Sequence, residues 1–441
     1  MKRLAVCPSA ILCLLAMGVW GESVFAASPE PLPDPLTLEY ALSLIDEGHP
    51  DLLAEQAEQA QLLAQLQGID ARNALDISVE GRARWVGPPS IEDEDVTDDH
   101  KLSLYVRKPL YDFGRTDALR QATQQASLGR EQRYQAVRDK RRIAIMQAFF
   151  DALLSDMEYA RDNEALAVAY IALDRLRHRQ ELGQASDIAI LEKEAEYQRV
   201  RYQLAQSETR QRATRARLAN LLNRPGMLPS NLRKPELDYQ QRKLPEFETL
   251  VEQAMQKNPE LLALQAELAA AQQRIEAARA EQWPRLDGEL EASSYTRELG
   301  SYDRWRAGVT LQVPIYSGGR VDAAVANQQA QQYAVQARLD KARFDLRQSV
   351  LDLWLELQTL RLQQEKANSE QDYRELYLDR SRANYEMEFT ADLGDAMVRL
   401  SEAQLGLAQT EYQLAIAWER LDALAGASGN NALVAAEGMA E

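Results

Sequence analysis

The strongest constraint on this chain of 441 residues is an internal duplication. The hexapeptide at 49–54 (HPDLLA) returns at 258–263 as NPELLA, and the segment 106–115 is echoed at 313–320. Such a repeat predicts two copies of one structural unit. We therefore expect units at 27–223 and 246–426. A proline-rich linker at 224–245 should join them, and a flexible tail should follow at 427–441.

The first 26 residues have the pattern of a secretory signal peptide. Lys2 and Arg3 precede an apolar run, and small residues stand near a cleavage position after Ala26. An uncleaved membrane anchor is the alternative interpretation. Cys7 and Cys13, the two cysteines of the chain, both lie in this segment. The mature protein is therefore expected to be exported, acidic and free of disulfides.

Each unit contains two stretches in which apolar and polar residues alternate strictly, which predicts strands with one apolar and one polar face. The expected strands are 74–86, 101–110, 285–295 and 304–314. Their length of about ten residues is what a tilted transmembrane strand needs, although ordinary hairpins on a soluble sheet would alternate too. No stretch after the leader has the ~18 consecutive apolar residues of a spanning helix. The chain should either stay soluble in the periplasm or enter a membrane as strands.

Long helices are predicted by the absence of proline between Pro109 and Pro225 and after Pro314. The expected helical regions are 114–222 and 318–424. A stretch such as 115–182 would extend about 100 Å at ~1.5 Å per residue. Apolar positions at coiled-coil spacing predict helices packed in pairs, with polar faces toward water on both sides. The fold class is thus mainly α with membrane β, a helix–strand–strand–long-helix unit present twice.

In this order of elements the chain resembles the TolC-like outer-membrane efflux proteins, the exit ducts of tripartite pumps and type I secretion systems. The resemblance covers residues 36–426 and rests on two tip segments, at Ser186 and Asp392, and two strand-to-helix turns. The turn residues are Pro109, Tyr111, Gly114 and Arg115 in the first unit and Pro314, Tyr316, Gly319 and Arg320 in the second.

The resemblance implies a homotrimer in the outer membrane of a Gram-negative type of cell. Three chains would form a 12-stranded β-barrel in contact with outer-membrane lipid, continuous with a 12-helix α-barrel in the periplasm. The implied partners are a periplasmic adaptor (membrane fusion) protein and an inner-membrane transporter. The duct would use no cofactor and catalyse no reaction.

The resemblance also assigns site residues. Asp392 and Asp395 would line the periplasmic constriction, where three chains bring six carboxylates into a ring that attracts cations. The alternative is that Asp392 caps the last helix, with Asp395 in its first turn. Gly183, Ser186, Asp187 and Tyr385 would contact the adaptor or lock the closed state. For the first tip, a plain helix hairpin capped by Ser186 or Asp187 is the alternative.

The second tip departs from the family pattern, because the segment between Tyr385 and Asp392 has neither the glycine nor the arginine often present there.

Other classes of function find less support. The three histidines, His49, His100 and His178, are far apart in sequence, so no metal site is expected. No combination of nucleophile, base and orienting group predicts an enzyme. A net charge of −17 disfavours nucleic acid as a partner. The main competing hypothesis is a soluble periplasmic coiled-coil adaptor or chaperone.

Overall fold

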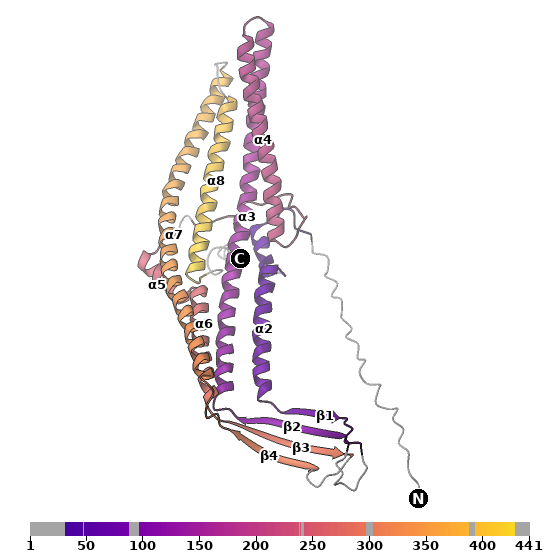
Figure 1. Ribbon diagram of the computed structural model, residues 1–441. Coiled ribbons are helices and arrows are strands. Elements are labelled where there is room, and N and C mark those ends of the chain that lie inside the picture. The colour runs from indigo at the N-terminus through magenta and orange to yellow at the C-terminus, as the bar shows by residue number, and fades with distance from the viewer. Residues whose placement is uncertain are drawn as a thin grey trace, which may run out of the picture.

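The computed structural model describes residues 31–46, 48–87, 97–237, 239, 242–296, 303–387 and 393–427. Its helices run along one long axis, and a sheet extends sideways from one end of them (Figure 1). The expected leader, the tail from 428 onward and Asp392 lie outside the described residues. Within the described part, no helix is both long enough and apolar enough to cross a membrane.

The same order of elements occurs twice, which confirms the predicted duplication. The first unit contains α1 (Leu38–Ser43), the 3-10 helix η1 (Leu44–Asp46), α2 (Pro50–Arg72), β1 (Asp76–Arg82), β2 (Lys101–Tyr111), α3 (Arg115–Glu181) and α4 (Asp187–Leu221). The second contains α5 (Phe247–Lys257), α6 (Pro259–Arg279), the 3-10 helix η2 (Ala280–Gln282), β3 (Arg285–Tyr295), β4 (Trp305–Gln312), α7 (Arg320–Glu386) and α8 (Leu393–Leu424). The two longest helices, α3 and α7, have 67 residues each.

The four strands form one antiparallel sheet in the order β1-β2-β3-β4, so the β2–β3 pair joins the two units. Two strands are shorter than the sequence predicted. The ladder of β1 ends at Arg82, after which Trp85 keeps only an isolated bridge to Asp98. Strand β4 ends at Gln312, two residues before Pro314, which has no N–H to donate to a ladder.

Glycine is required at the turn into each long helix. Gly114 and Gly319 precede α3 and α7 with φ angles of 88° and 79°, a left-handed conformation that side chains with a Cβ disfavour. At the first turn the Asp112 carboxylate accepts hydrogen bonds from the backbone N–H of Gly114 (3.2 Å) and Thr116 (2.8 Å). The start of α3 is therefore fixed by the turn that connects it to β2, through the side chain of Asp112.

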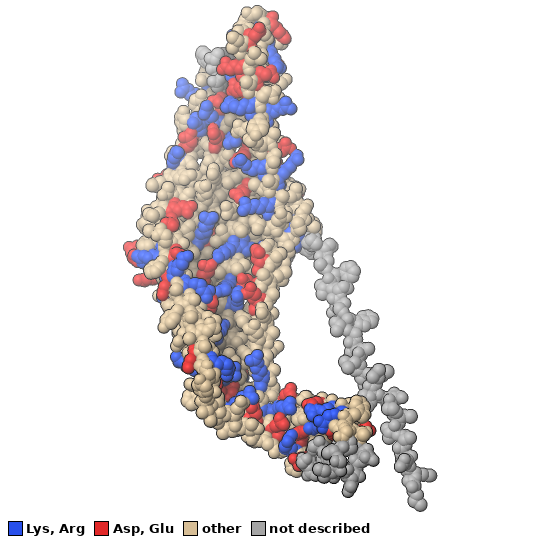
Figure 2. Space-filling model, in the orientation of Figure 1, with Lys and Arg blue, Asp and Glu red and all other residues tan. Residues whose placement is uncertain are grey.

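The long helices pack as antiparallel pairs, α3 with α4 and α7 with α8, and α6 lies between α3 and α7 (Figure 1). Acidic and basic side chains are interspersed along the visible face of these helices (Figure 2). The apolar core is concentrated at mid-length, where α1, α3, α5 and α8 meet the linker. There the ring of Phe150 stacks on that of Tyr412 with centroids 4.4 Å apart.

A buried polar network ties the linker to both units. The Glu419 carboxylate of α8 accepts from the Tyr239 hydroxyl at 2.8 Å and from Arg142 Nε of α3 at 3.0 Å. Arg242 donates to both oxygens of Asp422 at 2.6 and 2.7 Å. Burial, with the nearby Glu419 carboxylate, raises the pKa of the Tyr239 hydroxyl, so this group remains a donor. The network holds the linker against the helices at the level of the core.

The contact between the two units is close enough to need glycine. A Cβ on Gly129 of α3 would come within 3.1 Å of the Ala263 carbonyl oxygen and 3.3 Å of the Ala266 Cβ. We expect Gly129→Val to destabilise the protein by about 1–3 kcal/mol, the usual cost of overpacking. Thermal unfolding followed by circular dichroism in detergent measures this.

Gly68→Ala in α2 is the matched control, because a Cβ there meets nothing within 4 Å and the equivalent position in α6 is Ala277. Helix propensity should raise its stability by up to about 1 kcal/mol. Equal melting temperatures for the two variants would contradict close packing of α3 on α6.

Candidate functional site

The sheet has one apolar face, and its side chains are largely exposed in the single chain. Its exposed residues include Ile77, Val79, Leu102, Leu104, Leu290, Val309 and Leu311. The registers of the strands place these residues next to one another across all four strands. An apolar surface of this extent is unusual on a soluble monomer and marks contact with lipid or with another protein. Trp85 and Trp305, at 70% and 74% exposure, are not packed in a core.

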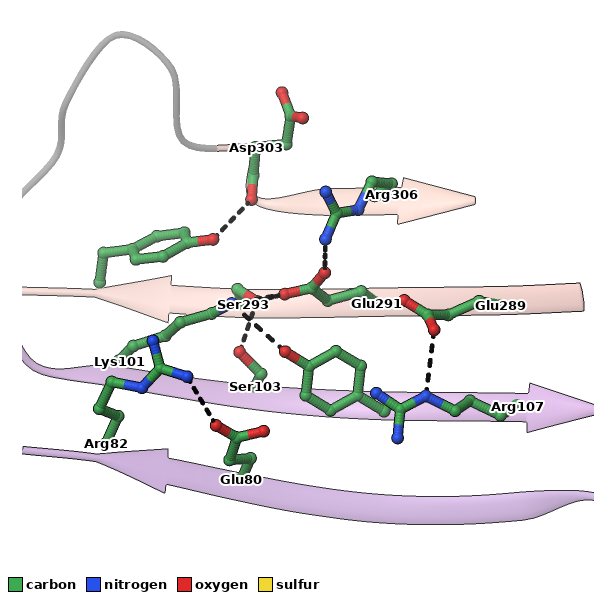
Figure 3. Close-up of polar contacts among 12 residues, drawn as sticks. Glu80, Arg82, Lys101, Ser103, Arg107, Glu289, Glu291, Ser293, Asp303 and Arg306 are labelled. Carbon is green, nitrogen blue, oxygen red and sulfur yellow. Dashed lines mark hydrogen bonds and ion pairs between the residues drawn. The ribbon is translucent and has the colours of Figure 1, made fainter. Parts of the chain in front are cut away.

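The opposite face carries a group of ion pairs centred on Glu291 of β3 (Figure 3). Its carboxylate accepts from Lys101 Nζ of β2 at 2.7 Å and pairs with Arg306 of β4. Ser293 Oγ donates to the same carboxylate at 2.8 Å and lies 2.7 Å from Ser103 Oγ. The Glu291 side chain is only 4% exposed. Three neighbouring strands are thus joined through one carboxylate.

Further ion pairs extend this polar face. Arg107 Nε contacts Glu289 Oε2 at 3.0 Å, and Arg82 Nη2 contacts Glu80 Oε1 at 3.0 Å (Figure 3). A polar cavity of about 230 Å³ lies at the end of the sheet distant from the helices. It is lined by Arg82, Arg84, Asp99, Lys101, Glu291, Tyr295, Asp303 and Arg306. Charged groups of both signs at this density suit a surface in contact with water rather than lipid.

At the turns from sheet to helix, the predicted residues have different positions. Pro109 and Tyr111 flank a register shift in the β2–β3 ladder, whereas Tyr316 is 90% exposed. Arg115 and Arg320, equivalent in the two units, bind the same carboxylate. Their Nη2 and Nη1 atoms lie 2.8 and 3.1 Å from the two oxygens of Glu281 in η2. The sequence analysis missed Glu281, because its partners come from two helices far from it in sequence.

The first tip is a capped helix hairpin. Gly183 follows the end of α3 with φ of 71°, and its N–H donates to the Gln180 carbonyl at 2.7 Å. Ser186 Oγ accepts from the Ala189 N–H at 3.3 Å and so caps α4, and Asp187 accepts from Gln180 Nε2 at 2.6 Å. The capping role considered for Ser186 is therefore present in the structure.

Three apolar side chains around this tip are strongly exposed, at 67–79%: Leu182, Ile188 and Leu191. The sequence analysis did not single them out. The sequence feature that could have identified them is a set of apolar residues on both sides of the turn, at positions outside the apolar repeat of the coiled coil. They form an apolar end to the α3–α4 hairpin, which extends beyond the α7–α8 hairpin (Figure 1).

At the second tip the structure describes Tyr385 and Asp395 but not Asp392. Tyr385 lies near the end of α7 and is 57% exposed. Asp395, in the first turn of α8, accepts from Arg399 Nε at 2.8 Å, and this hydrogen bond raises the pKa of Arg399. A Cβ on Gly394 would lie 2.7 Å from Val168 Cγ2, so the start of α8 packs directly on α3.

Comparison with known proteins agrees with this geometry. The family model described as outer membrane efflux protein matches residues 41–224 and 250–427, which is more than half of the chain. Protein CyaE of Bordetella pertussis is 26% identical over 277 residues, or 62% of this chain. The aligned region spans 58% of the length of CyaE, so the chain covers less than two thirds of this relative.

Solved structures share the fold at lower identity. CusC superposes with a TM-score of 0.72 at 20% identity, over 89% of this chain and 92% of its own. The Campylobacter jejuni outer membrane channel CmeC has a TM-score of 0.73 at 15% identity, over 89% and 87%. The outer membrane protein VceC of Vibrio cholerae has 0.70 at 16%, over 89% and 97%.

The Glu291 cluster generates a testable prediction. Glu291→Gln keeps the shape of the side chain but leaves Lys101 and Arg306 facing each other without their shared counter-charge. We expect this variant to melt several degrees below the unmodified protein in detergent, as measured by circular dichroism.

Glu289→Gln is the control, because Glu289 and Arg107 are 42% and 48% exposed and such pairs contribute little. If the Glu291 variant melts no lower than the Glu289 variant, the cluster does not join the strands energetically.

Proposed function

Because the chain belongs to the outer membrane efflux protein family, we propose that three copies form a channel through the outer membrane. Substrates of a tripartite efflux pump or of a type I secretion system would leave the cell through it. The observation that carries the proposal is a sheet with one lipid-compatible and one water-compatible face, whose two outer strands have a partner on one side only among the described residues.

The physical argument begins with the backbone of those outer strands. In lipid, every backbone N–H and C=O group needs a partner within protein, so a spanning sheet must close on itself. Four strands are too few, because membrane barrels start at about eight. Three copies of a four-stranded sheet give twelve strands and use every edge. The apolar face would then meet lipid, and the Glu291 face would meet water in the lumen.

The length of the helices is consistent with a duct that continues from the sheet along the long axis of the molecule. The 67 residues of α3 and of α7 each extend about 100 Å at ~1.5 Å per residue, a length of the order of a periplasm. In each chain α3 and α7 start just after β2 and β4, and α2 and α6–η2 end just before β1 and β3. Three copies of these four helices would therefore continue a twelve-stranded barrel as a wall of twelve helices. Cargo could then pass from the periplasmic end to the outside in water.

For the implied partners, the tip of the α3–α4 hairpin is the surface that we favour. Its exposed Leu182, Ile188 and Leu191 would contact a periplasmic adaptor protein, which would in turn connect the duct to an inner-membrane transporter. Gly183 and Ser186 would fix the shape of this tip, with Asp187 beside them.

The competing function, a soluble periplasmic adaptor or chaperone, predicts a different cellular distribution. Cell fractionation tests it: we expect the protein in the outer membrane, and a heat-modifiable trimer when it is run unheated on a gel. A fully soluble monomer without detergent would contradict the channel. The matched control is a known soluble periplasmic protein from the same cells, which should be absent from the membrane fraction.

The gate proposal concerns Asp392 and Asp395 at the periplasmic end. Replacing both by asparagine should weaken the block of single-channel current by multivalent cations, because the proposed ring loses its negative charge. Planar-bilayer recordings measure the block. Tyr385 is proposed to contribute to the lock of the same constriction.

Arg399→Gln separates the gate from a local role of Asp395, because it removes the ion pair of Asp395 and leaves both carboxylates. Cation block in this variant should persist or increase. Unchanged block in the double aspartate variant would leave these residues only a helix-capping role.

A further inference from the structure

The two units of the chain meet along a seam formed by α3, α6 and α7, in which the same arrangement of ion pairs occurs twice. At its centre, Arg133 Nη2 of α3 and Arg338 Nη2 of α7 lie 2.9 Å from the two oxygens of Glu267 in α6. Arg133 and Arg338 are equivalent positions, as are Arg115 and Arg320, which share Glu281. Glu267 and Glu281 therefore each receive one arginine from their own unit and one from the preceding unit.

One of these two acids, Glu267, has an acidic counterpart at the outer edge of the chain. The β1–β2 and β3–β4 hairpins have the same register once the repeat spacing is applied, as Asp76↔Arg107 corresponds to Arg285↔Gln312. By this correspondence Glu58 of α2 is the counterpart of Glu267. Glu58 already pairs with Arg130 of its own unit and is 48% exposed.

The small residues of the seam are also repeated. Gly129 of α3 packs against Ala263 and Ala266 of α6. Its counterpart in α7 is Ala334, and the counterparts of the two alanines in α2 are Ala54 and Ala57. Small residues would thus also line a contact between α7 of one copy and α2 of another, although Ala334 carries a Cβ where Gly129 has none, so these helices would lie slightly farther apart than α3 and α6.

Among the described residues, one face of α7 lacks the cover that the equivalent face of α3 has. Phe150 of α3 stacks on Tyr412 of α8, and Val168 contacts Gly394 of α8. The counterparts in α7, Leu355 and Tyr373, are 48% and 54% exposed. A second copy would cover these residues if its first unit packed on α7 in the way that the second unit packs on α3 within one chain.

The register of the strands can be carried over by the same correspondence and compared with the polarity of the two faces. Within the chain, Lys101 of β2 lies opposite Tyr295 of β3. The same register between β4 of one copy and β1 of the next places Leu311 opposite Gly81 of the partner subunit, and Thr310 opposite Arg82 of the partner subunit. Apolar positions then face apolar positions and polar face polar, whereas a slip of one residue would invert every pair.

We propose that β4 and α7 of one chain bind β1 and α2 of a second copy in the register Thr310 opposite Arg82 of the partner subunit. In this seam Arg338 bridges Glu267 of its own chain and Glu58 of the partner subunit. Glu58 then receives two arginines, as Glu267 does. The inference rests on the proposed trimeric channel and specifies how its copies join.

Disulfide trapping tests the register. In the variant with Thr310→Cys and Arg82→Cys, mild oxidation should yield covalent dimers and trimers on a non-reducing gel. Within one chain β1 and β4 are separated by two strands, a distance of roughly 14 Å that no disulfide can span. The control variant combines Thr310→Cys with Glu80→Cys, two residues out of register, and should cross-link several-fold less.

The outcomes separate the inference from the proposed function. A non-covalent trimer whose control pair cross-links better than the in-register pair would overturn the register while leaving the channel intact. A protein that stays monomeric in mild detergent would overturn both.

The arginine bridge has its own test. Arg338→Gln should lower the temperature at which unheated trimers dissociate on a gel, and adding Glu58→Gln should lower it little further, since both act on one contact. Arg343→Gln is the control, because Arg343 pairs with Asp340 on its own helix. Fully additive effects of the Arg338 and Glu58 changes would overturn the bridge.

Discussion

The backbone edges of the outer strands are the constraint on which the rest of this structure depends. Strands β1 and β4 each have one paired side within the described chain, and their apolar side chains face outward. Water could hydrate such edges in solution, but a bilayer core offers no hydrogen-bond partners. A sheet that is to sit in lipid must therefore find its missing strands in other copies. The long helices α3 and α7 start just after β2 and β4, so their position follows from the same closure.

Duplication provides a simple way to satisfy that requirement. A unit that already packs on its own counterpart within one chain needs only to repeat the contact between chains. The two contacts are not identical, however: Glu281 takes an arginine from each unit, whereas its counterpart in α2 is Arg72. Within the part of the chain that the structure describes, the linker network around Glu419 likewise has no symmetric copy in the first unit. The chain thus combines contacts that recur from unit to unit with contacts that occur once, so its two units are not interchangeable.

Much of the fold could be predicted from the sequence, because its signals are local or periodic. The repeat, the alternating strands and the proline-free helices require no knowledge of three-dimensional contacts. The glycines before α3 and α7 were also identifiable, since their left-handed conformation is a property of the turn itself. Strand ends were less accurate, because the last rungs of a ladder depend on a partner strand rather than on alternation.

The site was harder to predict, for a physical reason. Glu291 becomes central only once the register brings Lys101 and Arg306 to it from neighbouring strands. Glu281 and Glu267 are equally silent in the sequence, because each joins helices that are distant along the chain. Ser186 was foreseen as a cap because capping is a local interaction. The proposed gate depends on Asp392, which lies outside the described residues, and on contacts between copies.

The central claim, that three copies build one closed tube, is tested most directly by cryo-electron microscopy of the detergent-solubilised protein. Viewed along the long axis, the particles should show three-fold symmetry and a ring of twelve helices around a water-filled centre. Single rods of one chain, or a ring with another symmetry, would contradict the account.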